Sequence, residues 1–405
     1  MWTRRACLTA LVSAPAVLRG AKSYTFEEIE RFLQRGDLSK VSRHDLPTPA
    51  LILELDAFEA NVQKMASHAK QSGRALRPHG KTHKCPEIAK RLIRAGAVGC
   101  CAAKVSEAEA FAADGVTGLL ITSAMVGQGR IERAVRLAKS RPDTIFCVDN
   151  VQNAEDLDAA ARTARLKMRV AIDLLVGRRT GITPGEPAVA LAKRIDALKN
   201  LEFVGLQAYA GHASHTKGFE NRKKVSEEAM GLAVETRRAI EKSGVRCDWL
   251  SGASTGTYNI DSNIEGVTEL QPGSFMFMDV DYSVIGGTSG EKYRDFATSL
   301  FVITTVISKP SDSNAIVDGG FKTFATDRPF GPQLRDRDDI PYAWAGDEHG
   351  NLNLSKADRP VKLGDRLEFV VPHCDPTVNL HDQLFALRGD KVEGVWKIAA
   401  RGKLQ

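Results

Sequence analysis

The sequence predicts an α/β protein in which a (β/α)8 barrel is followed by an antiparallel β domain. From about residue 46 to 279, short apolar runs alternate with helical stretches rich in Ala, Glu, Lys and Arg, which is typical of parallel βα units. After residue 281 the runs become β-rich and are separated by Gly, Pro, Asn and Asp, which favours antiparallel strands. An open, doubly wound sheet is the alternative for the first region, because alternation alone does not show whether the sheet closes.

Eight apolar runs are candidate barrel strands. They are residues 75–78, 98–102, 119–122, 144–148, 168–173, 203–208, 248–251 and 268–271. Helical patterns lie between them, the longest at 222–243. In the second region the β-rich runs are 299–308, 314–318, 366–371 and 392–400. We therefore expect a barrel over residues 45–281 and a C-terminal β domain over 282–405.

Composition excludes several classes of protein. Lys and Arg outnumber Asp and Glu by 56 to 50, a net charge of +6, and no run of five or more basic residues occurs. Nucleic-acid binding is therefore not expected, although an anionic substrate or cofactor suits the sign of the charge. No apolar stretch reaches the roughly 18 residues of a membrane-spanning helix.

Residues 1–21 predict a signal segment. Arg4 and Arg5 precede a weakly apolar run over 6–18, which is the layout of a signal peptide with a twin-arginine motif. The protein is then periplasmic or exported; the alternative is a frayed extension of a cytoplasmic protein. The seven cysteines form no regular framework and predict buried free thiols, which export after folding would accommodate.

The most unusual segment is RPHGKTHK at 77–84, directly after the first predicted strand. Barrel enzymes place their chemistry at the C-terminal ends of the strands. Lys81 is surrounded in sequence by basic and imidazole side chains, so it is a candidate for a depressed pKa and for Schiff-base formation with an aldehyde. A solvated basic loop is the alternative.

Two other segments are candidate ligand sites. The run SGASTGT at 251–257 follows the seventh predicted strand, and its small and hydroxyl residues let backbone N–H groups approach an anion such as phosphate. His373 and Asp375 are two residues apart, so on an extended chain they face the same side and could share a divalent ion such as Zn²⁺ or Mn²⁺. An ordinary loop, and a turn capped by Asp375, are the alternatives.

Further polar side chains follow the fifth and sixth predicted strands. Arg178 and Arg179 come after the fifth, and Tyr209, His212 and His215 come after the sixth. Each group alone is compatible with a surface loop. Because these loops all follow C-terminal strand ends, we expect them to meet at the mouth of the barrel.

Several of these segments together resemble a known family. PTPA at 47–50, Leu55-Asp56, Asn61 and RPHGKTHK are similar to the alanine-racemase-type barrels, the fold type III enzymes that bind pyridoxal 5′-phosphate (PLP). Within that family the chain most resembles the D-threonine aldolase and D-serine dehydratase branch, over about residues 45–397. The resemblance implies PLP, a small D-amino acid substrate, and a homodimer with each β domain near the partner's barrel mouth.

The resemblance also implies which residues bind the cofactor. Lys81 matches the lysine that carries PLP, Arg179 matches an arginine near the cofactor ring, and Tyr209 matches an active-site tyrosine. Four residues match the loop that binds the phosphate: Gly252, Ser254, Thr255 and Gly256.

The chemistry follows from the same resemblance. His373 and Asp375 match the metal ligands of the aldolases, whereas the dehydratases carry Cys at the second position. His215 matches a histidine near the substrate hydroxyl and is the expected base. The family therefore implies a lyase that cleaves D-β-hydroxy amino acids by retro-aldol chemistry, such as D-threonine to glycine and acetaldehyde, assisted by Mn²⁺ or Zn²⁺, or by Mg²⁺ or Co²⁺.

Three other functions remain open on the sequence. A dehydratase of D-serine or D-3-hydroxyaspartate would use the same parts but break the Cβ–O bond. A racemase would need a second acid–base group from the β domain, for which Tyr282, Tyr293 and Tyr342 are candidates, and would leave His373 and Asp375 unexplained. A PLP carrier without turnover would need neither the β domain nor metal ligands.

Overall fold

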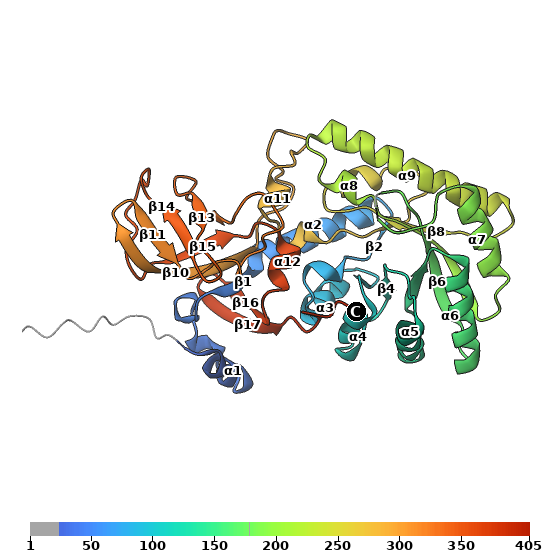
Figure 1. Ribbon diagram of the computed structural model, residues 1–405, viewed down its shortest axis with the longest axis horizontal. Helices are drawn as coiled ribbons and strands as arrows, with labels where there is room; N and C mark the ends of the chain where they lie inside the picture. The colour runs from blue at the N-terminus through green and yellow to red at the C-terminus, as the bar shows by residue number, and fades with distance from the viewer. Residues whose placement is uncertain (1–23, 178) are drawn as a thin grey trace, which may run out of the picture.

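The computed structural model describes residues 24–177 and 179–405, and it shows a parallel barrel beside a largely antiparallel sheet (Figure 1). The predicted signal segment at 1–21 lies outside the described residues. No described helix is long and apolar enough to cross a membrane. The six described cysteines are buried and free, as predicted.

Eight parallel strands form the barrel, each at a predicted position. They are β2 (Ala75–Leu76), β3 (Cys100–Ala102), β4 (Leu119–Ile121), β5 (Ile145–Val148), β6 (Met168–Asp173), β7 (Leu201–Ala208), β8 (Trp249–Gly252) and β9 (Glu269–Leu270), paired in the order β2-β9-β8-β7-β6-β5-β4-β3. The two ends of this order also meet, because Val98 N donates to Leu76 O and Cys101 N donates to Pro78 O. The sheet therefore closes into the predicted barrel and does not stay open.

Helices surround the barrel (Figure 1). They are α3 (Pro86–Arg94), α4 (Val105–Ala113), α5 (Gln128–Ser140), α6 (Val151–Ala164), α7 (Glu186–Asp196), α9 (Phe219–Lys242) and the short α8 (Gly211–Ser214) and α10 (Tyr258–Asp261). Local sequence explains where they begin. Pro86 opens α3 at a position where no N–H is required, and Asn150 caps α6 by accepting from Gln152 N at 2.8 Å.

The second sheet has nine strands. They are β1 (Ala50–Glu54), β10 (Leu300–Ser311), β11 (Asn314–Val317), β12 (Gln333–Leu334), β13 (Tyr342–Trp344), β14 (Gly350–Asn353), β15 (Arg366–Val370), β16 (Gln383–Arg388) and β17 (Lys391–Lys397). The predicted runs correspond to β10, β11, β15 and β17. Shorter strands with weaker apolar patterns, such as β13 and β14, were not predicted.

Strand β1 comes from the N-terminal part of the chain yet lies inside the second sheet. It pairs antiparallel with β10 and parallel with β16, so the segment 45–281 expected to form the barrel contains a strand of the other sheet. Both faces of β1 are buried: Leu51 and Leu53 join the main core, whereas Ile52 packs in a second core with Ile29 of α1 (Phe26–Gln34). An apolar run buried on both faces suits a central strand of either sheet, and so its sequence did not reveal which sheet it joins.

One long and two short helices lie between the two sheets. Helix α2 (Leu55–Gln71) runs from the second sheet to the barrel, and α12 (Cys374–Val378) lies at the junction (Figure 1). Helix α11 (Val280–Ser283) begins against the end of β15, because Val280 N donates to Val371 O and Asp281 N donates to Pro372 O. Residues of the second sheet's connections are thereby held at the open end of the barrel.

Candidate active site

A cavity at the C-terminal ends of the barrel strands brings most of the predicted residues together. Seven of them line it: Lys81, Tyr209, His215, Ser254, Thr255, His373 and Asp375. Three do not line it: Arg179, Gly252 and Gly256. The cavity therefore joins four loops of the barrel to the segment that follows β15. Three of these loops were expected at the barrel mouth; the expected loop with Arg179 does not line the cavity, and the loop with Gln271 does.

Lys81 lies in a single 3₁₀ turn, Gly80–Thr82, which begins four residues after the end of β2 at Leu76. Lys81 N donates to His79 Nδ1 at 3.3 Å, and His79 Nε2 lies 3.3 Å from Thr122 Oγ1. Burial, followed by the positive charges of Lys81 and Arg179, holds the pKa of His79 well below its usual value. A neutral imidazole that accepts at Nδ1 must donate from Nε2, so this ring fixes the backbone at Lys81.

The charge state of Lys81 differs from the prediction. Burial by itself lowers its pKa, but the attraction of Tyr209 and Asp375 outweighs burial and the repulsion of Arg179, and the pKa is raised above its ordinary value. Asp375 Oδ2 lies 3.7 Å from Nζ. The expectation of a depressed pKa was wrong because the sequence could not show that a carboxylate from the other end of the chain lies beside this amine.

Tyr209 lies between two cations. Its ring centre is 5.6 Å from Lys81 Nζ and 4.9 Å from Arg179 Cζ. Both distances are within the range of cation–π attraction. Arg179 thus lies outside the cavity lining but contacts a residue that forms it.

The loop at 252–257 packs so closely that two of its positions require glycine. A Cβ at Gly252 would lie 2.4 Å from Ala208 O, and one at Gly256 would lie 2.1 Å from Ser214 O. Between them Ala253 has a φ of +67°, a strained conformation that is concentrated at functional sites. The loop is thereby pressed against the β7–α9 connection, which carries Tyr209 and His215.

The hydrogen bonds within this loop leave one hydroxyl and two backbone N–H groups without an acceptor among the described residues. Thr257 Oγ1 donates to Asp261 Oδ2 at 2.7 Å, so the proton in its 3.0 Å contact with Ser254 Oγ comes from Ser254. Thr255 Oγ1 accepts from Phe275 N at 2.9 Å and keeps its own proton. The backbone N–H groups of Thr255 and Gly256 have no acceptor in the described parts of the chain. Such a group of free donors suits a phosphate.

His215 lies against a carboxylate that the sequence analysis did not identify. Its Nδ1 is 3.1 Å from Asp281 Oδ2 on α11, and its ring packs against Tyr282. Asp281 also accepts from Arg328 Nε at 2.8 Å. Burial raises the pKa of Asp281, but His215 and then Arg328 lower it to about 2. The carboxylate is therefore ionised at neutral pH and can stabilise a protonated His215.

His373 and Asp375 flank the start of α12 and both line the cavity. His373 Nδ1 lies 2.8 Å from Asp327 Oδ2, which leaves Nε2 for another ligand. Burial raises the pKa of Asp375, but Lys81 and His373 outweigh it, and the pKa is lowered. Within residues 24–177 and 179–405, no cluster of three or more His, Cys, Asp or Glu side chains is arranged to hold a metal ion. His373 and Asp375 therefore remain candidate metal ligands, without a third His, Cys, Asp or Glu ligand among the described residues.

Buried polar atoms without partners line the floor of the cavity. Thr82 Oγ1 and Gln271 Oε1 are both buried and have no hydrogen-bond partner among the described residues. A buried polar atom left unpaired is costly. A polar ligand in the cavity would satisfy these two atoms.

The three tyrosines considered for a racemase already have partners. Tyr282 Oη lies 2.8 Å from Ser214 Oγ, Tyr293 Oη donates to Thr255 O at 2.6 Å, and Tyr342 Oη donates to Gly319 O at 2.8 Å. Burial also holds the pKa of Tyr282 well above its usual value. None of these hydroxyls presents a free acid–base group, which disfavours a racemase.

Comparison with known proteins agrees with this architecture. Residues 53–281 match the alanine racemase N-terminal domain, and residues 299–387 match a putative serine dehydratase domain. A 3-hydroxy-D-aspartate aldolase of Paracoccus denitrificans is 39% identical over 90% of this chain and 95% of its own length. A D-threonine aldolase of Arthrobacter sp. is 38% identical over 88% of this chain and 93% of its own.

The chain belongs to the D-threonine aldolase family. It is accordingly a PLP-dependent lyase of fold type III, as the sequence resemblance implied. The crystal structure of D-threonine aldolase from Filomicrobium marinum superposes with a TM-score of 0.86 at 38% identity, covering 89% of this chain and 97% of that one. A solved mutant of D-threo-3-hydroxyaspartate dehydratase, 26% identical with a TM-score of 0.78 over 88% of this chain and 98% of that one, is described as in the metal-free form.

Gln271, which lines the cavity, was missed from the sequence, as were three charged residues next to the site: Asp281, Asp327 and Arg328. None of the three charged residues lies in a strand end of the barrel or in a recognisable motif. Arg328-Pro329 and Asp281-Tyr282 occur in connections of ordinary composition. Only the pairing of their charges with two histidines in space marks them as part of the site.

Proposed function

We propose that this protein is a metal-assisted PLP lyase that cleaves D-β-hydroxy amino acids between Cα and Cβ. The observation that carries the proposal is the convergence in one cavity of Lys81, a histidine paired with a carboxylate, and the His373/Asp375 pair. Membership of the D-threonine aldolase family supplies the reaction class. D-Threonine and 3-hydroxy-D-aspartate are the two substrates that the relatives' names suggest.

The residues present fit PLP. Lys81 would carry the cofactor, and the free N–H groups of Thr255 and Gly256 would bind its phosphate. Arg179 and Tyr209 would border the ring, and the unpaired Thr82 and Gln271 atoms would gain partners. When bound, PLP withdraws electrons from Cα of the amino acid and so permits the Cα–Cβ bond to break.

A divalent ion fits the pair of His373 and Asp375. An imidazole Nε2 and an ionised carboxylate suit Mn²⁺ or Zn²⁺, and also Mg²⁺ or Co²⁺. Asp327 holds His373 by Nδ1, an arrangement common behind metal-binding histidines. Two protein ligands leave the other coordination positions to water and substrate, where the ion would act as a Lewis acid on the substrate hydroxyl.

His215 would remove the proton of the β-hydroxyl. Since Nδ1 faces Asp281, Nε2 is the nitrogen available to the substrate. An ionised Asp281 stabilises the imidazolium that forms and holds the ring in one orientation. Departure of this proton allows the hydroxyl oxygen to become the carbonyl oxygen of the released aldehyde.

The test is product identification with D-threonine. We expect glycine and acetaldehyde, with activity lost in EDTA and restored by Mn²⁺ at least as well as by Zn²⁺, because the carboxylate of Asp375 is a hard ligand. For 3-hydroxy-D-aspartate we expect glycine and glyoxylate. Formation of 2-oxobutanoate and ammonia from D-threonine would instead favour a dehydratase, the alternative suggested by the matching domain at 299–387.

Two further properties are proposed from the family and the sequence. We propose a homodimer, which light scattering of the purified protein would test. We also propose export by the twin-arginine-like segment at 1–21, which fractionation of cells expressing the full chain would test.

A further inference from the structure

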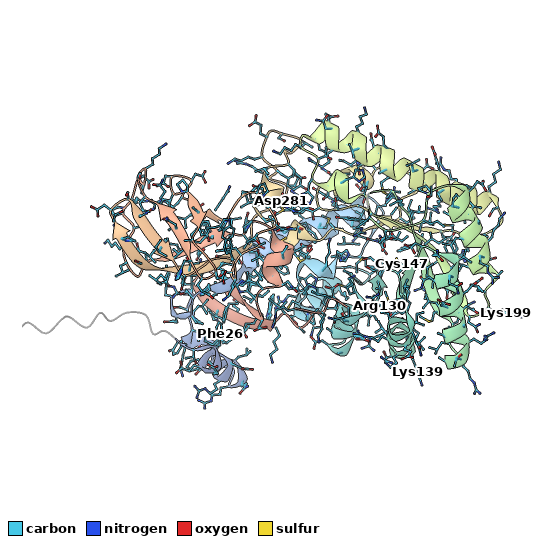
Figure 2. The ribbon with its side chains drawn as sticks, viewed as in Figure 1. Phe26, Arg130, Lys139, Cys147, Lys199 and Asp281 are labelled. Carbon is cyan, nitrogen blue, oxygen red and sulfur yellow. The ribbon has the colours of Figure 1, made fainter. Side chains whose placement is uncertain are left out.

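Three side chains connect the two histidines of the site in a continuous series of contacts. His215 Nδ1 lies 3.1 Å from Asp281 Oδ2, an ion-pair contact without hydrogen-bond geometry. Asp281 Oδ2 in turn accepts from Arg328 Nε at 2.8 Å. Arg328 Nη1 donates to Asp327 Oδ2 at 3.0 Å, and that oxygen lies 2.8 Å from His373 Nδ1. Figure 2 shows Asp281 at the junction of the barrel and the second sheet.

One guanidinium therefore contacts both carboxylates that face the histidines. A guanidinium is planar and presents its donors in a fixed geometry, so it holds Asp281 and Asp327 at a set separation. Each carboxylate in turn faces Nδ1 of its histidine and leaves Nε2 for the reaction. The Asp281 side chain is 13% exposed and that of Arg328 is 27% exposed, so this pair is less screened than a surface ion pair, whereas Asp327 is exposed.

We propose that Arg328 is a positioning residue that couples the proposed metal ligand His373 to the proposed base His215. The inference rests on the proposed function for the roles of the two histidines. Arg328 does not line the cavity and acts through Asp281 and Asp327. This coupling has a specific consequence: a change at Asp281 should weaken metal binding, although the ion pairs of Asp281 are with His215 and Arg328 and not with a proposed metal ligand.

The first test measures the geometry without using the reaction. Histidine-selective ¹⁵N NMR of the full chain reports which ring nitrogen of each histidine is protonated, with His215→Gln and His373→Gln used for assignment. In Arg328→Gln we expect the signals of both histidines to move. Unchanged signals of either histidine would overturn the coupling, whatever the enzyme's substrate or metal.

The second test is a double-mutant cycle on metal affinity. The probe is Mn²⁺, with the free ion counted by electron paramagnetic resonance in the PLP-loaded protein. We expect Arg328→Gln to weaken Mn²⁺ binding by about 10-fold or more, as is usual for residues behind metal ligands, and Asp281→Asn to weaken it by about 3-fold or more. Asp281→Asn should then add nothing in the Arg328→Gln background.

The control is Arg335→Gln. Arg335 also contacts two carboxylates, Glu54 and Glu368, but lies away from the cavity, so its loss should leave Mn²⁺ affinity and the histidine signals unchanged. The proposal would be overturned if the losses of Mn²⁺ affinity caused by Arg328→Gln and Asp281→Asn multiply in the double variant. A similar loss of Mn²⁺ affinity in Arg335→Gln would also overturn it. Absence of Mn²⁺ binding in the wild type would refute the metal role in the proposed function, and the NMR result would then decide the network by itself.

Discussion

The two halves of the site are held in place by different forces. In the barrel half, which comprises Lys81 and the loop at 252–257, close packing against backbone and hydrogen bonds within the loop fix the geometry. The second-domain half comprises Asp327, Arg328, His373 and Asp375. Its geometry is fixed by ion-pair contacts between side chains. The barrel half should therefore be sensitive to added volume, and the second-domain half to lost charge.

The largest effect is expected in the barrel half, at Lys81. Lys81→Ala should lower lyase activity by at least about 10³-fold, because the amine that would carry PLP is gone. The thermal midpoint should change little, since the side chain lies in a cavity and not in the core. Borohydride reduction followed by mass spectrometry checks the attachment, and a variant that still traps the cofactor would contradict the assignment.

The matching change in the second-domain half removes a proposed metal ligand. His373→Ala and Asp375→Asn should each lower activity by about 10²–10³-fold, the effect of losing a Lewis acid worth several kcal/mol. The same variants should keep PLP attached, because Lys81 and the 252–257 loop are held by other contacts. Absorbance of the bound cofactor together with Mn²⁺ binding separates the two halves; loss of both signals in one variant would show that the halves are not independent.

The barrel half was also the more predictable from sequence. All eight barrel strands were expected where they occur, and the predicted loops that carry Lys81, Tyr209 and Ser254 line one cavity. These features were predictable because hydrophobic period and strand direction are local properties. The second-domain half depends on contacts between distant segments. Arg328 and Asp281 carry no motif, and the raised pKa of Lys81 reflects a carboxylate 294 positions away in the chain.

Strand β1 shows the same limit at the level of the fold. Its run Ala-Leu-Ile-Leu is buried on both faces, which an interior strand of either sheet would require. Pairing with β10 and β16 decides its place, and those partners lie some hundreds of residues later. This strand was not predicted from the sequence, because its local pattern does not indicate a partner in either sheet.

Added volume should affect the barrel half selectively. At Gly256 a Cβ would lie 2.1 Å from the backbone oxygen of Ser214, which cannot move like a flexible side chain. We expect Gly256→Ala to cost about 2–3 kcal/mol of unfolding free energy and to weaken PLP binding, measured by urea denaturation and cofactor titration. The matched control is Gly231→Ala in α9, where a Cβ meets nothing within 4 Å and alanine should stabilise the helix by up to about 1 kcal/mol. Equal effects at both positions would contradict the packing account.

The smallest expected effect concerns pH and His83, a buried residue of the barrel half. Burial lowers the pKa of His83 to about 3, whereas the unfolded chain titrates near 6.5. Between these values only the unfolded chain binds this proton, so falling pH favours unfolding by about 1.4 kcal/mol per pH unit. Asp281 behaves differently. Its pKa is about 2 in the folded protein and about 3.9 in the unfolded chain, so its contribution to the free energy of unfolding is constant until the pH falls below about 4.

His83→Asn tests this difference. The asparagine oxygen can still accept from Cys85 N, which now donates to His83 Nδ1 at 3.1 Å, but it cannot bind the proton. Any cost in packing is the same at every pH, so the variant should be less stable at pH 7 yet lose less stability between pH 6.5 and 5.5. The difference from wild type over this interval should be about 1 kcal/mol, below the limiting slope because an unfolded His is only half protonated at pH 6.5. Urea denaturation at several pH values measures both slopes. Parallel slopes would mean that folded His83 takes up the proton, and that the barrel half tolerates a buried charge as the second-domain half does.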